Sequence, residues 1–203
     1  MSRIKELLRN SKITGNAYLF IGRHYYELYY TLKKKHMARA MKKYSKRTIG
    51  QLQSIFEKTG LLFFFDMGTL LGIVRDGKLM KYDYDIDMAV KTSSENEKEK
   101  IRKLLIESGC KLLIEDVVDE LGTVEESYKL NGIKFDVNYY VNEGKSDVCY
   151  LLYKDPESTA TRLNVAKLSC DEIKRTVKTP FQGMMISIPE NAEAYLAQRY
   201  GDN

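Results

Sequence analysis

The chain has 203 residues, of which 43% are hydrophobic and 30% are charged, and this composition excludes a wholly disordered protein. Its three scattered cysteines, Cys110, Cys149 and Cys170, form no C-x-x-C pair, so we expect reduced core residues and a cytoplasmic compartment. No apolar run is long enough to span a bilayer and no secretory signal follows the first residues, so we expect any membrane contact to be peripheral, at the inner face.

The net charge of +5 hides two parts of opposite sign. Residues 1–47 hold 13 basic and 2 acidic residues, a balance of 13 − 2 = +11, and the remainder holds 33 − 13 = 20 basic and 28 − 2 = 26 acidic residues, a balance of −6. Both histidines, His24 and His36, lie in the basic part. Their absence beyond it excludes a Ser-His-Asp or Cys-His nucleophile and a His-rich zinc site there. We expect a boundary near Arg47, between a basic, Tyr-rich helical arm (1–47) and a domain at 48–203.

In the basic arm we expect two helices. Arg3–Asn10 places its apolar residues on one side, and Ala17–Tyr44 alternates tyrosine pairs with lysine runs without a proline. The basic side chains form either a docking surface for an anionic membrane or a solvated helix face with the tyrosines packed inward. Of the anionic partners, we expect a membrane surface rather than nucleic acid.

The rest of the chain predicts helices and strands in a mixed order. We expect helices at Thr48–Thr59, from Leu70 to Arg75 and from Ser93 or Ser94 to Gly109, and strands at 61–65, Lys111–Val118, Val124–Leu130 and Ile133–Val141. Asn131-Gly132, between the last two strands, is a strong hairpin signal. Farther along we expect a strand at Asp147–Tyr153, mostly helical structure at 156–178, a short strand within 180–189 and a helix at Glu190–Tyr200.

Three aspartates, Asp83, Asp85 and Asp87, alternate with larger side chains. If this segment is a strand, alternate side chains point to one face, so the three carboxylates lie together. Like charges at this spacing repel unless a cation lies among them, which indicates a metal site. A further acid, Asp136, stands alone among apolar residues on the second hairpin strand.

Three blocks of the sequence together resemble the LicD/fukutin family. They are Gly68-Thr69-Leu70-Leu71-Gly72 with Arg75-Asp76-Gly77, then Tyr82-Asp83-Tyr84-Asp85-Ile86-Asp87, and a closing element of Pro189, Asn191, Tyr195, Leu196 and Tyr200-Gly201-Asp202. The resemblance covers roughly Thr48 to Asp202 and implies an α+β, nucleotidyltransferase-like fold with a mixed β-sheet flanked by helices. It also implies an enzyme that moves phosphocholine or a polyol phosphate from a CDP-activated donor to a sugar hydroxyl of a cell-surface glycan or glycolipid.

The resemblance and the chemistry of phosphoryl transfer assign catalytic roles to four aspartates. Asp85, Asp87 and Asp136 would hold Mg²⁺ or Mn²⁺, which neutralises charge on phosphate oxygens. Asp136 would either bridge the metal or accept the proton of the attacking hydroxyl. Asp83 would be a further ligand or a contact to the acceptor.

Four other residues would bind the donor phosphates. Gly68 lets a phosphate approach the backbone closely, and the N–H of Thr69 points at it. Arg75 and Lys78 would supply cationic contacts.

Two other functions stay open. The same acidic residues would serve a nucleotidyltransferase that moves a nucleoside monophosphate onto a sugar phosphate, a protein or a nucleic acid, and release of pyrophosphate rather than CMP would identify it. The second is a non-catalytic docking module, a basic arm on an inert body. That function would require defects in the acidic residues or in the Gly-Thr turn, and the sequence shows neither.

Overall fold

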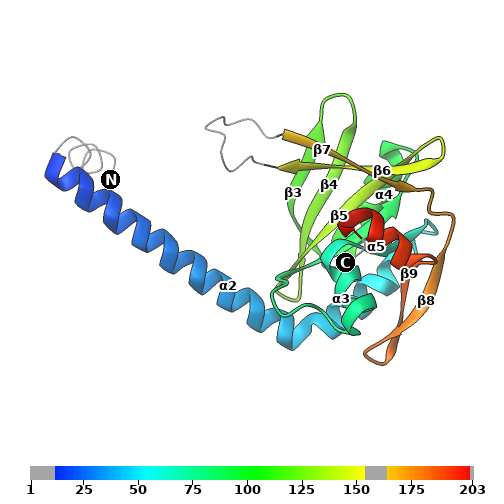
Figure 1. Ribbon diagram of the computed structural model, residues 1–203, viewed down its shortest axis with the longest axis horizontal. Coiled ribbons are helices and arrows are strands. Elements are labelled where there is room, and N and C mark those ends of the chain that lie inside the picture. The colour runs from blue at the N-terminus through cyan, green and yellow to red at the C-terminus, as the bar shows by residue number, and fades with distance from the viewer. Residues whose placement is uncertain (1–11, 154–163, 202–203) are drawn as a thin grey trace. The chain divides into compact units, whose positions relative to one another are not determined.

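The computed structural model describes residues 12–153 and 164–201, with only the backbone described for residues 12–31 and 33. The chain divides into two compact units, residues 1–39 and 40–203, which are treated separately. Helix α2, Lys12–Glu57, begins in the first unit and ends in the second (Figure 1). Across the described residues, no helix is long and apolar enough to cross a bilayer.

Two helices predicted from the sequence, Ala17–Tyr44 and Thr48–Thr59, are one element, α2. The residues between them include no glycine or proline that would break a helix. The predicted helix at Arg3–Asn10 lies outside the described residues. The domain boundary predicted near Arg47 falls inside α2 and stays a prediction.

A seven-stranded mixed sheet forms the centre of the 40–203 unit. Its strands are β1 (Phe63–Phe65), β2 (Asp85–Lys91), β3 (Lys111–Val118), β4 (Gly122–Leu130), β5 (Ile133–Glu143), β6 (Ser146–Tyr153) and β7 (Asn164–Asp171). The order is β1-β2-β5-β4-β3, and β6 pairs with both β5 and β7. Strands β2 and β5 run parallel, whereas the other pairs described run antiparallel. The expected α+β fold with a mixed sheet is confirmed.

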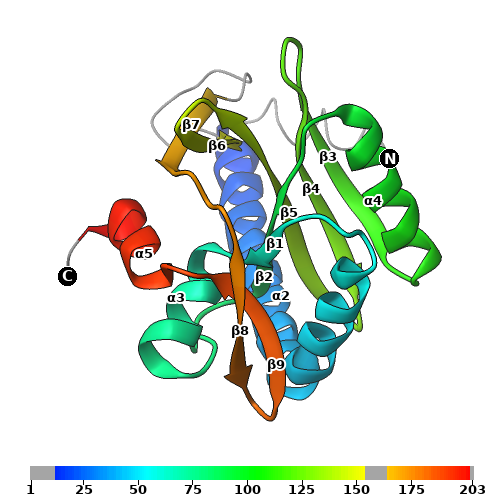
Figure 2. The ribbon, with the colours of Figure 1, turned by 90° about the vertical axis from the view of Figure 1, so that its right-hand side faces the viewer.

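The helices of this unit pack on different strands of the sheet (Figure 2). Helix α4, Glu95–Glu107, contacts β3 and β4, whereas α3, Met67–Asp76, contacts β2 and α5, Ala192–Tyr200. The core includes Phe56 of α2, Phe64 of β1 and Leu105 of α4, each 0% exposed. Close-packed side chains from several elements meet there, so the core joins α2 and α4 to the sheet.

The turn between β4 and β5 confirms the predicted hairpin. Asn131 and Gly132 have φ angles of 53° and 84°, the left-handed pair of a type I′ turn. The register that follows pairs Ser127 of β4 with Asp136 of β5. The turn therefore decides which β4 side chains stand beside the lone acid of β5.

The helical structure predicted at 156–178 is wrong for the residues described. Residues from 164 onward form β7 and then β8 (Thr176–Phe181), which makes a hairpin with β9 (Met184–Pro189), and residues 154–163 lie outside the described part. Strand β7 pairs with β6 along its whole length. These backbone hydrogen bonds to the preceding strand favour a strand over the predicted helix. The other elements predicted for this unit agree with the structure to within a few residues.

Gly72 lets the chain that follows α3 return closely across the helix. A Cβ atom there would lie 2.7 Å from the carbonyl oxygen of Lys78 and 3.1 Å from the backbone nitrogen of Met80. We expect Gly72→Ala to lower the free energy of unfolding by about 1–3 kcal/mol, because the backbone must shift. Urea denaturation measures this change.

Gly50→Ala is the matched control. A Cβ atom at this position in α2 would make an ordinary contact of 3.5 Å with Sδ of Met184. The better helix propensity of alanine should raise the free energy of unfolding by about 0.5–1 kcal/mol. Effects of the same sign at both glycines would contradict the close approach at Gly72.

Candidate active site

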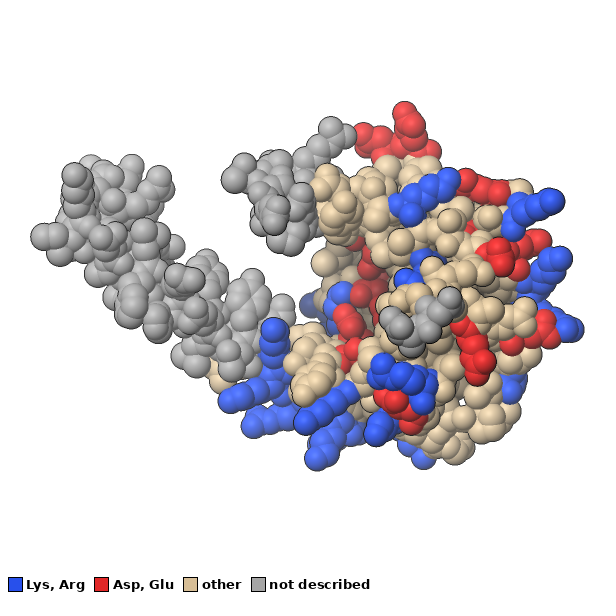
Figure 3. Space-filling model, in the orientation of Figure 1, with Lys and Arg blue, Asp and Glu red and all other residues tan. Residues whose placement is uncertain are grey.

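Two parallel strands bring three carboxylates and one amine to one face of the sheet. In the β2–β5 register, Asp85 pairs with Lys134 and Asp87 pairs with Asp136. Paired residues on neighbouring strands point to the same face, so the four side chains form a compact group. Figure 3 shows acidic side chains recessed in the surface of the 40–203 unit, with basic side chains nearby.

Asp136 is buried, and both of its carboxylate oxygens accept hydrogen bonds. Ser127 Oγ donates to Oδ1 at 2.5 Å and Lys134 Nζ donates to Oδ2 at 2.6 Å. The same Nζ lies 3.8 Å from Oδ2 of Asp85. Burial is the largest single influence on the pKa of Lys134 and tends to lower it, but the hydrogen bond to Asp136 and the charges of Asp136, Asp85 and Glu125 together outweigh burial, and the pKa is raised. The sequence pattern places Lys134 on the same strand face as Asp136 but assigns it no role in the site. Ser127 is a site residue that the sequence pattern does not indicate.

Asp83 lies before β2 rather than in it. The strand begins at Asp85, and the N–H of Asp83 donates to the carbonyl of Met80 at 3.2 Å in the preceding turn. The predicted alternation therefore holds for Asp85 and Asp87 but not for Asp83. The Asp83 carboxylate instead lies next to α3, because a Cβ atom on Gly68 would be 3.5 and 3.7 Å from its two oxygens.

The N-terminus of α3 presents backbone N–H groups at this position. Asp66 caps the helix: its Oδ1 accepts from the N–H of Met67 at 2.7 Å and its carbonyl accepts from the N–H of Leu70 at 2.9 Å. The N–H groups of Gly68 and Thr69 have no acceptor within the helix, and a helix N-terminus attracts anions. Gly68 carries no side chain that would obstruct a phosphate. The predicted phosphate contact thus has a suitable local geometry.

Thr69 also joins α3 to β2. Its Oγ1 accepts a hydrogen bond from the N–H of Asp87 at 3.0 Å. Arg75, by contrast, forms an exposed ion pair with Asp76 in the last turn of α3, about 10 Å along the helix from Gly68. Lys78 is exposed in the loop that follows. The structure does not bring Arg75 or Lys78 to the helix N-terminus, and their contact with the donor stays a prediction.

The aspartates raise one another's pKa values. Burial is the largest cause of the raised pKa of Asp87, followed by the charges of Asp85, Asp136, Asp66 and Asp83. The pKa values of Asp83 and Asp85 are also raised, again chiefly by burial. A cation that binds among these carboxylates would relieve the repulsion.

These residues fit a divalent cation. In the part of the chain that the structure describes, no three His, Cys, Asp or Glu residues form a metal-holding group by themselves. Mg²⁺, however, typically takes one or two protein carboxylates and completes its shell with phosphate oxygens and water, and Asp85 and Asp87 supply such a pair. Oδ2 of Asp83 is buried without a hydrogen-bond partner among the described residues, which leaves a carboxylate oxygen available for a cation.

The capping carboxylate of Asp66 is fully buried and is held by one tyrosine of β5 and one of the C-terminal helix. Tyr140 donates to its Oδ2 at 2.7 Å, and Tyr195 donates to its Oδ1 at 2.5 Å. The guanidinium of Arg199 donates to the hydroxyl of Tyr140 and lies over both rings. The sequence showed Tyr195 as part of the closing element, but its partner is 129 residues away and no local pattern connects them.

Tyr200, in the same closing element, borders the acidic group. It is 50% exposed, and burial together with the charges of Asp66, Asp87 and Asp83 raises its pKa. Asp202, the last residue of the element, lies outside the described part.

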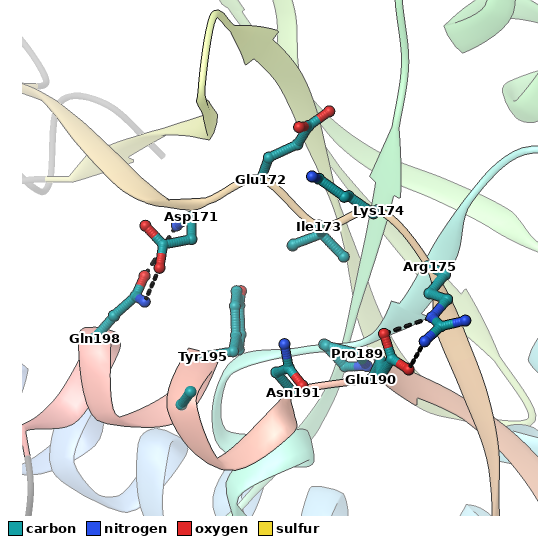
Figure 4. Close-up of a pocket in the computed structure, with 11 residues that line it drawn as sticks. Asp171, Glu172, Ile173, Lys174, Arg175, Pro189, Glu190, Asn191, Tyr195 and Gln198 are labelled. Atoms are coloured by element: carbon teal, nitrogen blue, oxygen red, sulfur yellow. Dashed lines mark hydrogen bonds and ion pairs between the residues drawn. The ribbon is translucent and has the colours of Figure 1, made fainter.

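A separate cavity of about 280 Å³ lies between the β7–β8 connection and the first turns of α5 (Figure 4). Tyr195 forms part of its wall, and pairs of Arg175 with Glu190 and of Asp171 with Gln198 lie at its edges. None of the four predicted catalytic aspartates lines it. Tyr195 therefore connects the cavity wall with the cap of α3.

Comparison with known proteins identifies the family. Residues 60–191 match the family model described as LicD/FKTN/FKRP, nucleotidyltransferase domain. The chain belongs to this family. It is also 24% identical over 168 residues to the Mus musculus protein named Ribitol 5-phosphate transferase FKRP. That match covers 80% of this chain and 31% of the relative, so the chain spans about a third of the FKRP length.

The family membership confirms three expectations. It confirms the LicD/fukutin resemblance, the nucleotidyltransferase-like fold and membership of an enzyme family of phosphotransferases. The roles of individual side chains stay predictions, and their positions in the structure are the basis for testing them.

The acidic face continues from β5 onto β4. Glu125 of β4 is partly buried, and its pKa is raised to about 7 by burial first and then by Asp136 and Asp116. A raised carboxyl pKa means that the folded protein binds the proton more tightly than the unfolded chain. The stabilising effect of that proton is therefore present below pH 4.5 and is lost as the pH rises to about 7.

We expect Glu125→Gln to gain stability relative to the wild type between pH 4.5 and about 7. The gain should reach about 1–3 kcal/mol and stay constant at higher pH, because the wild-type carboxylate is then ionised in both states. Urea denaturation at a series of pH values measures it. The exposed Glu120→Gln serves as the control and should show no such trend, and a pH-independent difference for Glu125→Gln would refute the assignment.

We expect Tyr195→Phe to lower the free energy of unfolding by about 1–3 kcal/mol. The variant removes a hydrogen bond to the fully buried carboxylate of Asp66 and leaves the ring in place. Thermal and urea unfolding measure the loss. Tyr82→Phe is the control, because this side chain is 73% exposed, and its effect should stay within about 0.5 kcal/mol. Equal effects of the two variants would show that Tyr195 does not hold the cap.

Proposed function

We propose that the chain is a metal-dependent phosphotransferase that moves a phosphorylated head group from a CDP-activated donor to a sugar hydroxyl of a glycan or glycolipid. The observation that carries this proposal is the position of Asp85 and Asp87 beside Asp136, at the N-terminus of α3, in a chain of the LicD/FKTN/FKRP family. The acidic residues suit a metal and the helix N-terminus suits a phosphate.

The reaction is a displacement at phosphorus. The oxygen of the acceptor hydroxyl attacks the phosphorus that bears the head group, and the bond from that phosphorus to the bridging oxygen breaks. CMP leaves with the electron pair, and the hydroxyl proton passes to a carboxylate of the site. A Mg²⁺ or Mn²⁺ ion bound at the site would neutralise charge on the diphosphate.

Different residues of the site are proposed to bind the metal ion, the donor phosphate and the acceptor. Asp85 and Asp87 would hold the ion, and Asp136 would complete the acidic group in one of the two roles predicted for it, metal ligand or proton acceptor. The N–H groups of Gly68 and Thr69 orient a donor phosphate. Asp83, next to Gly68, is placed to contact the ion or the acceptor.

The name of the FKRP relative makes ribitol 5-phosphate the first head group to test. Phosphocholine and other polyol phosphates are the next candidates, because the family resemblance includes them. The family description also names a nucleotidyltransferase domain, which keeps nucleotidyl transfer as the second candidate. The product separates the two, since head-group transfer releases CMP and nucleotidyl transfer releases pyrophosphate.

Residues 1–47 are a candidate membrane contact within this proposal. Their balance of 13 basic and 2 acidic residues suits an anionic surface. Sedimentation of the full chain with liposomes that contain anionic lipid tests the contact, and neutral liposomes are the control.

We expect Asp87→Ala to lower the rate of CMP release by at least about a hundredfold, because the variant removes a carboxylate that holds the ion. Its free energy of unfolding without metal should be unchanged or higher, since like-charge repulsion falls. The assay incubates the purified chain with a panel of CDP-linked donors, a sugar acceptor and Mg²⁺. Glu107→Ala, an exposed residue of α4, is the control. Full activity of Asp87→Ala would overturn the assignment.

A further inference from the structure

Lys134 occupies an unusual place, because a basic side chain stands inside an acidic site. Its ammonium donates to Asp136 Oδ2 at 2.6 Å and lies 3.8 Å from Asp85 Oδ2. The two acids belong to adjacent parallel strands, so the amine bridges β5 and β2. A cation is therefore already present between two of the carboxylates predicted to hold the metal.

The partners of Asp136 make this arrangement specific. Its second oxygen accepts from Ser127 Oγ at 2.5 Å, and its side chain is 8% exposed. Both oxygens of a buried carboxylate are thus bonded by side chains of the chain itself. Asp87, in register with Asp136, has no such amine at hydrogen-bond distance among the described residues. The carboxylates of the site therefore differ: Asp136 is already paired with a cation, whereas Asp87 is surrounded by other acids.

Lys134 is also partly exposed to solvent. Its side chain is 32% exposed, whereas Asp136 behind it is nearly covered. An ammonium that is fixed at one end by a carboxylate and partly open at the other can meet a phosphate oxygen without leaving its partner, since it has three donors. An ordinary surface ion pair has no such buried anchor.

We propose that Lys134 is the resident second cation of the site. It takes the position that a second divalent ion occupies in two-metal phosphoryl-transfer sites, where the ions lie about 3.5–4 Å apart. The chain then binds one divalent ion through Asp85 and Asp87, while Asp136 anchors Lys134, whose free N–H groups contact the donor diphosphate. This inference rests on the proposed function and changes the role of Asp136 from metal ligand to anchor.

The charge of the four side chains agrees with this division. Asp85, Asp87, Asp136 and Lys134 sum to 1 − 3 = −2, the charge that one divalent ion balances, and Asp83 beside Gly68 adds one further negative charge to the site. Removal of the ammonium leaves three carboxylates and an open position beside Asp136. A metal ion should then bind more tightly or in greater number.

The test counts Mn²⁺ bound to the full chain by electron paramagnetic resonance, without donor or acceptor. We expect one ion per wild-type chain and one per Lys134→Arg chain. For Lys134→Met, which keeps the length of the side chain and removes its charge, we expect a second ion or a first ion bound about tenfold more tightly. Lys178→Met removes another carboxylate-paired lysine, on β8, and should match the wild type. Thermal unfolding without metal verifies that each variant is folded.

Unchanged or weaker Mn²⁺ binding by folded Lys134→Met, or two ions per wild-type chain, would overturn the proposal. The same variants are then assayed for CMP release, where Lys134→Met should lose at least about tenfold and Lys134→Arg should retain most of the rate. If the wild-type chain releases CMP, and Lys134→Met changes neither Mn²⁺ binding nor the rate of CMP release, only the role proposed for Lys134 is wrong. If the wild-type chain binds no Mn²⁺ and releases no CMP from any donor, the proposed function is wrong, and so is the role of Lys134 that rests on it.

Discussion

The parallel pairing of β2 with β5 is the constraint on which the candidate site depends. Only with this register does Asp87 stand beside Asp136 and Asp85 beside Lys134. A shift of one residue would turn every side chain of β2 to the opposite face and separate the carboxylates. The buried core side chains of β2, such as Ile86 and Met88, make that shift costly, because they would become exposed on the site face.

A second constraint joins α3, the helix proposed to bind a donor phosphate, to the C-terminal helix α5. Asp66 caps α3, and its carboxylate is held by Tyr140 of the sheet and Tyr195 of α5. The direction of the α3 N-terminus therefore depends on a helix far along the sequence. The closing Tyr-containing element and the cap of the helix that carries Gly68 and Thr69 are therefore parts of one buried hydrogen-bond network.

The sequence predicted those parts of the fold and site that local patterns encode. The Asn131-Gly132 turn and the acidic strand are visible from residue types at fixed spacing. Strand β7 was not predicted in this way, because its structure depends on backbone pairing with β6, which the residue pattern of β7 alone does not show. Ser127 was missed because its hydrogen bond to Asp136 forms only across the folded hairpin. Lys134 was placed on the face of Asp136 by the strand pattern, but its ion pair with that carboxylate was not predicted.

The electrostatics of the site are set in large part before any ligand arrives. Acids gathered around Asp87 repel one another, while the pair of Lys134 with Asp136 removes one negative charge from the group. The N–H groups at the start of α3 add a partial positive charge on the side of Gly68. A diphosphate would thus meet favourable charge from the helix and from the lysine, and the uncompensated carboxylates of β2 would still require a cation.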